Sequence, residues 1–139
     1  MSTANSTADI RQVLRATLIA DALVSSYVSD RVYGAHLQDP DAQTVGYPLI
    51  IVEITGGDLI RTGRLNDLSM ALWAYSRTSL ADAEEIYRSC TVILHAERLT
   101  VTGISVNVIP TETGRPTDGW NENTRAHYVV GRWRVQATG

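Results

Sequence analysis

The stretch from Leu65 to Ser76 alternates regularly between two kinds of side chain, and no other feature of the sequence restricts the fold as strongly. Every second residue is apolar, namely Leu68, Met70, Leu72 and Ala74, and the more mixed residues between them are Ser69, Ala71, Trp73 and Tyr75. Because successive side chains of a strand point to opposite faces of a sheet, the pattern predicts a long strand with one buried face. Such a strand needs a sheet around it and a layer that covers that face.

Helices on either side of this strand are expected to supply the covering layer. Ser79 is a typical N-cap, Asp82 follows in the first turn, and apolar residues at helical spacing continue to about Glu97. Near the N-terminus, the spacing predicts a helix over Thr7 to Ala20. A short helix capped by Asp21 is expected to follow it and to end near position 29.

Three further strands and three loops complete the expected order. The strands are 48–55, 104–110 and 125–137, and the loops are 34–46, 56–64 and 111–124. Pro110 is expected to end its strand, since proline has no N–H to donate to a ladder. The order predicts one α+β domain over residues 1–139, with an antiparallel sheet of about four strands packed against two main helices. Residues 1–6 are small and polar and are expected to be flexible.

The composition agrees with one soluble domain. A chain of 139 residues that is 44% hydrophobic can bury one core, and its formal net charge of −3 gives no indication of a general nucleic-acid or membrane binder. There is no run of 18 apolar residues and no signal-peptide pattern, so the chain is expected to be made in a cytoplasm and to bind no membrane. The single cysteine, Cys90, cannot form an internal disulfide and is expected in the core.

Groups suited to nucleophilic catalysis are few. A Ser, Cys or Thr nucleophile needs a base within hydrogen-bond reach, and the available histidines are His36, His95 and His127. Cys90 and His95 lie five residues apart on one predicted helix, an offset that turns them away from each other. Glu84 and Glu85 are adjacent on that helix, also point apart, and are expected to form a solvated face.

Metal and nucleotide motifs are likewise not found. Asp39 and Asp41 flank a proline, but no further ligands follow them, which is typical of a solvated turn. Gly56, Gly57 and Gly63 follow a strand but match neither GxGxxG nor Walker A, which also needs a lysine. All 12 basic residues are arginine. No metal or cofactor is therefore expected.

Six arginines fall in the two later loops and on the last strand: Arg61, Arg64, Arg115, Arg125, Arg132 and Arg134. They could form a local basic surface despite the net negative charge, or be ordinary surface arginines. Arginine suits contacts between subunits because its guanidinium makes bidentate pairs and stacks on aromatic rings.

The succession of segments resembles a known family over nearly the whole chain. It begins with the helix LRATLIADALVSSYVSDRVY, followed by a variable loop and the strand YPLIIVEI. The long strand LSMALWAYSRTS then runs directly into the helix LADAEEIYRSCTVILHAERL, and RAHYVVGRWRVQA closes the chain. In this order the chain resembles the tail terminator, or tail completion, proteins of long-tailed bacteriophages and related particles.

The resemblance implies a structural role without catalysis. Such proteins form a ring of six subunits on the last ring of the tail tube, stop its growth, and join the tail to the head. The partners implied are further copies of the chain, the tail tube protein and a head-tail connector or adaptor protein, within a virion. DNA would meet the chain only as it passes through the lumen of the ring.

A ring of this kind needs two different surface patches on each subunit, which meet head to tail around a closed rotation. We expect the loops 56–64 and 111–124 to contact neighbouring subunits, tube or neck, with Trp120 as the buried anchor. Alternatively, Trp120 packs on its own sheet.

Two alternatives stay open at this stage. A head-to-tail adaptor of the neck can share the size and ring symmetry, although adaptors tend to be chiefly helical with an extended tail segment. The other alternative is a small enzyme or ligand-binding domain, in which Asp39, His36 or His127 would be required for binding.

Overall fold

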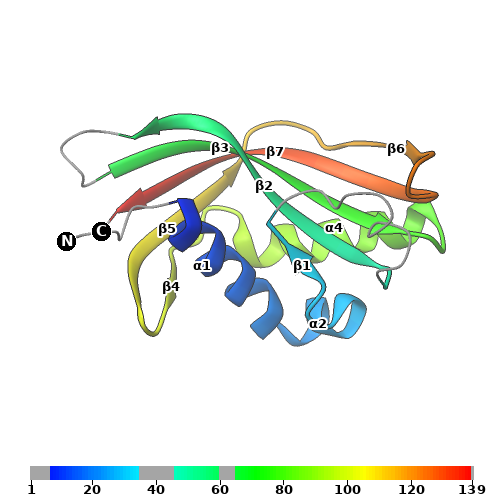
Figure 1. Cartoon of the computed structure of the whole chain (residues 1–139), viewed down its shortest axis with the longest axis horizontal. Coiled ribbons are helices and arrows are strands. Elements are labelled where there is room, and N and C mark those ends of the chain that lie inside the picture. Colours follow the sequence, from blue (N-terminus) through cyan, green and yellow to red (C-terminus); the bar gives the residue numbers. More distant parts are fainter. Residues whose placement is uncertain (1–6, 35–45, 60–64, 139) are drawn as a thin grey trace.

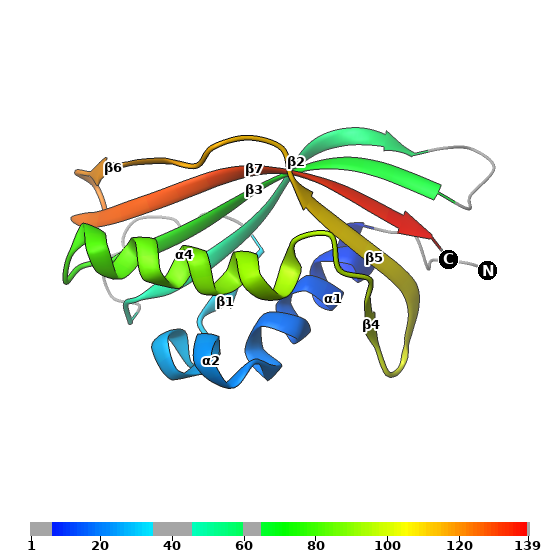
Figure 2. The ribbon, with the colours of Figure 1, turned by 180° about the vertical axis from the view of Figure 1, so that it is seen from behind.

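The computed structural model describes residues 7–34, 46–59 and 65–138, which form a helical layer on one face of a curled sheet (Figure 1). Its helices are α1 (Thr7–Ala20), α2 (Ala22–Val28) and α4 (Leu80–Leu94). Its strands are β1 (Val32–Tyr33), β2 (Leu49–Leu59), β3 (Leu65–Ser76), β4 (Leu99–Val101), β5 (Ile104–Glu112), β6 (Thr117–Asn121) and β7 (Ala126–Thr138). All three helices lie on the same side of the sheet, and α4 runs below β3 and β7 (Figure 2).

The last strand, β7, lies in the middle of the sheet. The strand order is β1-β2-β3-β7-β5-β4, and β6 also pairs with β7. On one side, β7 pairs with β3 along its whole length. On its other side, β5 pairs with the C-terminal half of β7, and β6 pairs with residues 126–130.

The sheet is larger than the sequence predicts. Its seven strands replace the expected four, and it is mixed, because β1 runs parallel to β2. The extra strands β1, β4 and β6 have two, three and five residues, too few to show an alternating pattern. The α+β class and the packing of helices on one face are confirmed.

The main core lies between the helices and this face of the sheet. The apolar set of β3 that the alternation predicts is buried there, together with Trp133 of β7. From the helices, Ile10, Leu14, Ile86 and Leu94 are fully buried. The predicted caps form as well: the Asp21 side chain accepts from the Val24 amide at 3.0 Å, and Ser79 accepts from Asp82 at 3.0 Å.

Three element bounds differ from the prediction. The strand β5 continues through Pro110 to Glu112, because the Pro110 carbonyl accepts from the Ala96 amide and not from β7. N–H and C=O of one strand residue point the same way, so the missing N–H also faces away from β7. Helix α4 ends at Leu94, since its C-cap His95 is extended, with ψ 119°, and Ala96 after it is left-handed, with φ 61°. Strand β2 passes Gly56 with a bulge and continues to Leu59.

A series of hydrogen bonds in the core connects α4 with the centre of the sheet. The indole Nε1 of Trp133 donates to the Tyr87 hydroxyl at 3.0 Å, and that hydroxyl donates to the Glu112 carboxylate. Burial raises the pKa of Tyr87, and the hydrogen bond to Glu112 adds to this effect. Tyr87 occupies space that is free only because Gly131 has no side chain: a Cβ at position 131 would lie 1.6 Å from the phenol oxygen. Two elements far apart in the sequence are thereby held in one position.

Candidate functional site: the second face of the sheet

The second face of the sheet carries the side chains that alternate with the core. No described helix packs on it, and its residues come from β2, β3 and β7 (Figure 1). It divides into an aromatic half around Tyr75 and a polar half around Arg132 and Arg134.

The aromatic half is a small second core. Leu49, Ile51, Tyr75 and Ala126 are buried there, with Tyr33, Tyr47, Trp73 and Tyr128 packed against them. The Trp73 ring stacks on Tyr75 at 5.8 Å between centroids, and its Nε1 donates to Glu53 at 3.2 Å. Burial raises the pKa of Tyr75 to about 12. This half is a packed aromatic cluster whose outer members, Tyr33, Tyr47, Trp73 and Tyr128, stay partly exposed.

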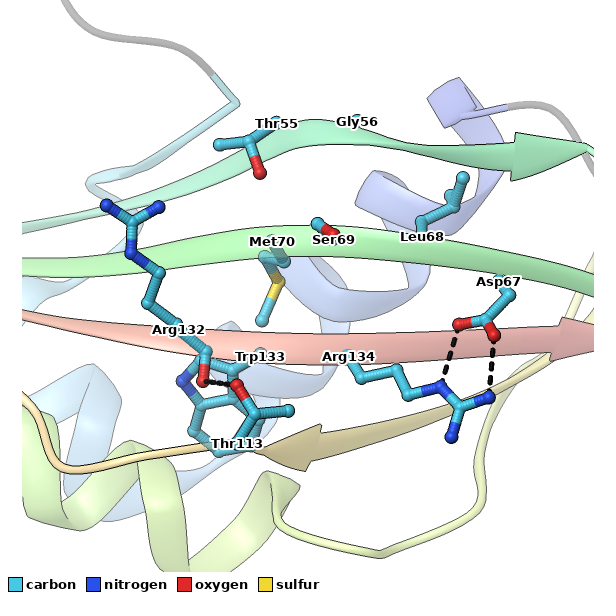
Figure 3. Close-up of a pocket in the computed structure, with 10 residues that line it drawn as sticks. All are labelled: Thr55, Gly56, Asp67, Leu68, Ser69, Met70, Thr113, Arg132, Trp133 and Arg134. Atoms are coloured by element: carbon cyan, nitrogen blue, oxygen red, sulfur yellow. Dashed lines mark hydrogen bonds and ion pairs between the residues drawn. The ribbon is translucent and has the colours of Figure 1, made fainter.

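The polar half is an open groove of about 690 Å³, shown in Figure 3. Its outward side chains are Thr55, Asp67, Ser69, Thr113, Arg132 and Arg134. Arg134 donates to both carboxylate oxygens of Asp67, at 2.9 and 2.6 Å. This guanidinium lowers the pKa of Asp67 below its usual value. The pair is charge-neutral and fixes Arg134 in place.

Arg132 differs from its neighbour. It is exposed, and among the described residues its guanidinium has no hydrogen-bond or ion-pair partner. Its backbone carbonyl accepts from both the amide and the hydroxyl of Thr113, at 2.9 and 3.1 Å, which fixes the base of the side chain. With the hydroxyls of Thr55 and Ser69 nearby, the groove can accept a carboxylate or phosphate from a partner.

A second candidate region is the outer edge formed by β6. Trp120 is 48% exposed there, and its Nε1 donates to Glu122 at 2.8 Å. Its ring meets His127 edge-on, with 4.8 Å between centroids. The sequence predicted a loop over 111–124, but β6 pairs with β7 and places Trp120 in a strand. Asn121 closes the hairpin by accepting from the Asn123 and Thr124 amides.

The predicted arginines separate into groups. Arg132 and Arg134 lie together in the groove, whereas Arg125 is exposed in the β6–β7 turn and Arg115 is exposed between β5 and β6. Arg61 and Arg64 lie outside the described residues. Asp67, Thr55 and Thr113 were not predicted from the sequence, although the alternation of β3 placed Ser69 on this face. The residues of β3 and β7 come together only through the register of these two strands, in which Ser69 pairs with Arg134.

The groups considered for catalysis do not converge. Cys90 is in the core, as predicted, and burial raises the pKa of its thiol to about 12. His95 is exposed and its Nδ1 accepts from the Glu112 amide at 3.0 Å, while His127 lies against Trp120. Glu84 and Glu85 are exposed on α4, which confirms the predicted solvated face. His36, Asp39, Asp41 and Gly63 lie outside the described residues.

The glycines 56 and 57 belong to strand β2 and not to the loop that the sequence predicts. Within residues 7–34, 46–59 and 65–138, no group of three or more His, Cys, Asp or Glu residues could hold a metal ion. No helix in the same part of the chain is long and apolar enough to cross a membrane.

Comparisons with known proteins find likeness in the fold. A chain from the virion of a native gene transfer agent particle superposes with a TM-score of 0.71 at 15% sequence identity, over 97% of this chain and 99% of that chain. A second solved chain, whose description names no function, superposes with a TM-score of 0.55 at 14% identity, over 97% of both chains. At such identities the likeness shows a shared fold alone. No family model and no curated protein matches the sequence.

Proposed function

We propose that this protein is a structural component of a tailed, phage-like virion. It forms a ring, a homohexamer, that caps the tail tube, ends its polymerisation and joins the tail to the head or neck. The observation that carries the proposal is the match in fold, over 97% of this chain and 99% of the other, with a chain of a gene transfer agent virion. Two chains that match from end to end differ little in domain content.

The surface of the chain supports assembly better than catalysis. A closed ring joins two different patches of each subunit. The described residues offer several separate candidate patches, among them the polar groove with Arg132 and the β6 edge with Trp120. We assign the contacts with neighbouring subunits, tube or neck to these regions and to Arg61, Arg64, Arg115, Arg125 and Arg134.

The charges also fit a channel through which DNA passes without being held. In the groove, Asp67 neutralises Arg134, which leaves Arg132 as the unpaired cation among the described groove residues. The net charge of −3 opposes any general attraction of the chain to DNA.

Light scattering tests the proposal directly. The purified chain is measured across a concentration series, alone and mixed with the tail tube protein of the same particle. A species of about six times the 15.2 kDa of one chain is expected, either alone or with the tube protein. A monomer at every concentration, unaffected by the tube protein, would contradict the proposal and favour a ligand-binding or enzymatic domain.

A further inference from the structure

Trp120 lies on an exposed strip of β6 whose chemistry is aromatic and acidic. The strip consists of Asp118 and Trp120 of β6 and of Glu122 in the turn that follows, and all three are exposed. Among the described residues, the large apolar side chains that are exposed are Leu23, Val92 and Trp120, and Trp120 is the aromatic one. Its indole is already held in one orientation by Glu122 and His127. A side chain fixed in this way loses little entropy when a partner covers it.

A pocket of about 310 Å³ lies at the opposite edge of the sheet, between α1 and the strands β1 and β2. Ala8 and Val52 contribute apolar walls, Tyr33 and Gly34 line the strand side, and Arg11, Gln12 and Arg15 of α1 line the helical side. We call this cavity the α1 pocket. Its size suits one aromatic side chain, and its composition joins apolar walls with cations.

Arg15 presents a fixed positive charge at the α1 pocket. Its Nε donates to the Val32 carbonyl at 2.8 Å and its Nη2 to the Asp30 carbonyl at 3.2 Å. Both acceptors are neutral, and no described carboxylate forms an ion pair with Arg15, so its charge is not cancelled locally. A guanidinium held in this way can pair with a carboxylate or stack on an indole.

The strip and the pocket are complementary but cannot meet within one chain. Strand β1 is the first strand in the sheet order, and β6 lies across β2, β3 and β7 from it. The strip brings an indole and two carboxylates, and the α1 pocket offers apolar walls and the guanidinium of Arg15. Because they are different patches at opposite edges, a contact between them repeats head to tail from copy to copy.

We propose that Trp120 of one copy of this chain inserts into the α1 pocket of the next copy, with Glu122 and Asp118 facing Arg15. This inference rests on the proposed ring and adds to it the cavity that receives the anchor. Gln12 is exposed at the pocket and forms no hydrogen bond with the described residues. The proposal makes it an interface residue.

Disulfide trapping tests the contact. Chains carrying Gln12→Cys are mixed with chains carrying Glu122→Cys and oxidised, alone and with the tail tube protein. Cys90 does not compete, because it is fully buried. The control pair replaces Gln12→Cys by Ala20→Cys, which is an exposed position on the same helix. Mixed dimers of Gln12→Cys with Glu122→Cys are expected to form at least about ten-fold faster than mixed dimers of Ala20→Cys with Glu122→Cys. The double variant Gln12→Cys with Glu122→Cys is expected to give a ladder of covalent oligomers.

Substitutions at the same contact provide the second measurement. Trp120→Ala and Gln12→Glu are each expected to weaken self-association about ten-fold or more, and Gln12→Arg to strengthen it, with unchanged urea midpoints. If the chain assembles but the cysteine pair reacts no faster than the control, the contact is wrong and the ring proposal stands. If the chain fails to assemble with or without tube protein and no mixed dimers form, both are wrong.

Discussion

Gly131→Ala is expected to lower the free energy of unfolding by about 3–5 kcal/mol. The new Cβ would lie 1.6 Å from the hydroxyl oxygen of Tyr87 and 2.5 Å from its Cζ, inside contact distance for any atom pair. Tyr87 would have to move, which strains the core and breaks its hydrogen bonds with Trp133 and Glu112. The indole N–H of Trp133 would then be buried without a partner. Urea denaturation followed by tryptophan fluorescence measures the change.

Gly114→Ala is the matched control for this substitution. A Cβ at Gly114 meets no atom within 4 Å, so its effect should stay within about 0.5 kcal/mol. Tyr87→Phe removes the closest atom, and the double variant Gly131→Ala with Tyr87→Phe should therefore cost less than the sum of the two single changes. A Gly131→Ala protein as stable as the Gly114→Ala protein would show that Tyr87 does not occupy this position.

Stability is expected to fall steeply in alkaline solution, above about pH 9. Three buried acids keep their protons longer in the folded chain than in the unfolded chain: burial raises the pKa of Cys90 from 9.0 to about 12, that of Tyr75 from 10.0 to about 12, and that of Tyr87 as well. The unfolded state therefore loses protons first as the pH rises, and unfolding becomes more favourable. The stability is fully present below the unfolded-state values and is lost through pH 9–12.

Each group contributes a slope of up to about 1.4 kcal/mol per pH unit, and the sum reaches roughly 3–5 kcal/mol by pH 11 after allowance for solvent screening of the tyrosines. Urea midpoints at pH 8, 9, 10 and 11 measure it. Tyr75→Phe should make the slope between pH 10 and 11 shallower. A midpoint that stays constant up to pH 11 would mean that these groups are hydrated in the folded chain.

Long periodic segments allowed the sequence to predict much of the fold. The predicted bounds of α1 and β3 agree with the structure, because both segments show many repeats of one period. The N-caps Asp21 and Ser79 were also predicted, since a cap acts over three residues and needs no distant partner. Local rules therefore suffice where the interactions themselves are local.

The missed elements depend on partners far away in the sequence. Residues 117–121 read TDGWN, which is typical of a turn, and they form a strand only because β7 offers its free side. Pro110 stays in a strand for a similar reason, since α4 ends beside it and supplies the Ala96 amide. Tertiary contact here overrides local preference.

The candidate site divides in the same way. The alternation of side chains along residues 125–137 is enough to predict that Arg132 and Arg134 share one face. Asp67 neutralises only Arg134 because of the register between β3 and β7. Asp67 and Arg134 lie 67 residues apart in the sequence. The α1 pocket has no periodic signal at all, because it combines residues from separate elements.

The central place of β7 also has a consequence for biosynthesis. A nascent chain that has not yet reached Ala126 lacks the strand that β3, β5 and β6 all pair with, so its sheet stays in separate pieces. Such long-range pairing closes late and makes folding depend on the finished polypeptide. Chains broken off during translation would be left unfolded and open to proteolysis. Prematurely ended products would thus be removed before they could compete with finished chains.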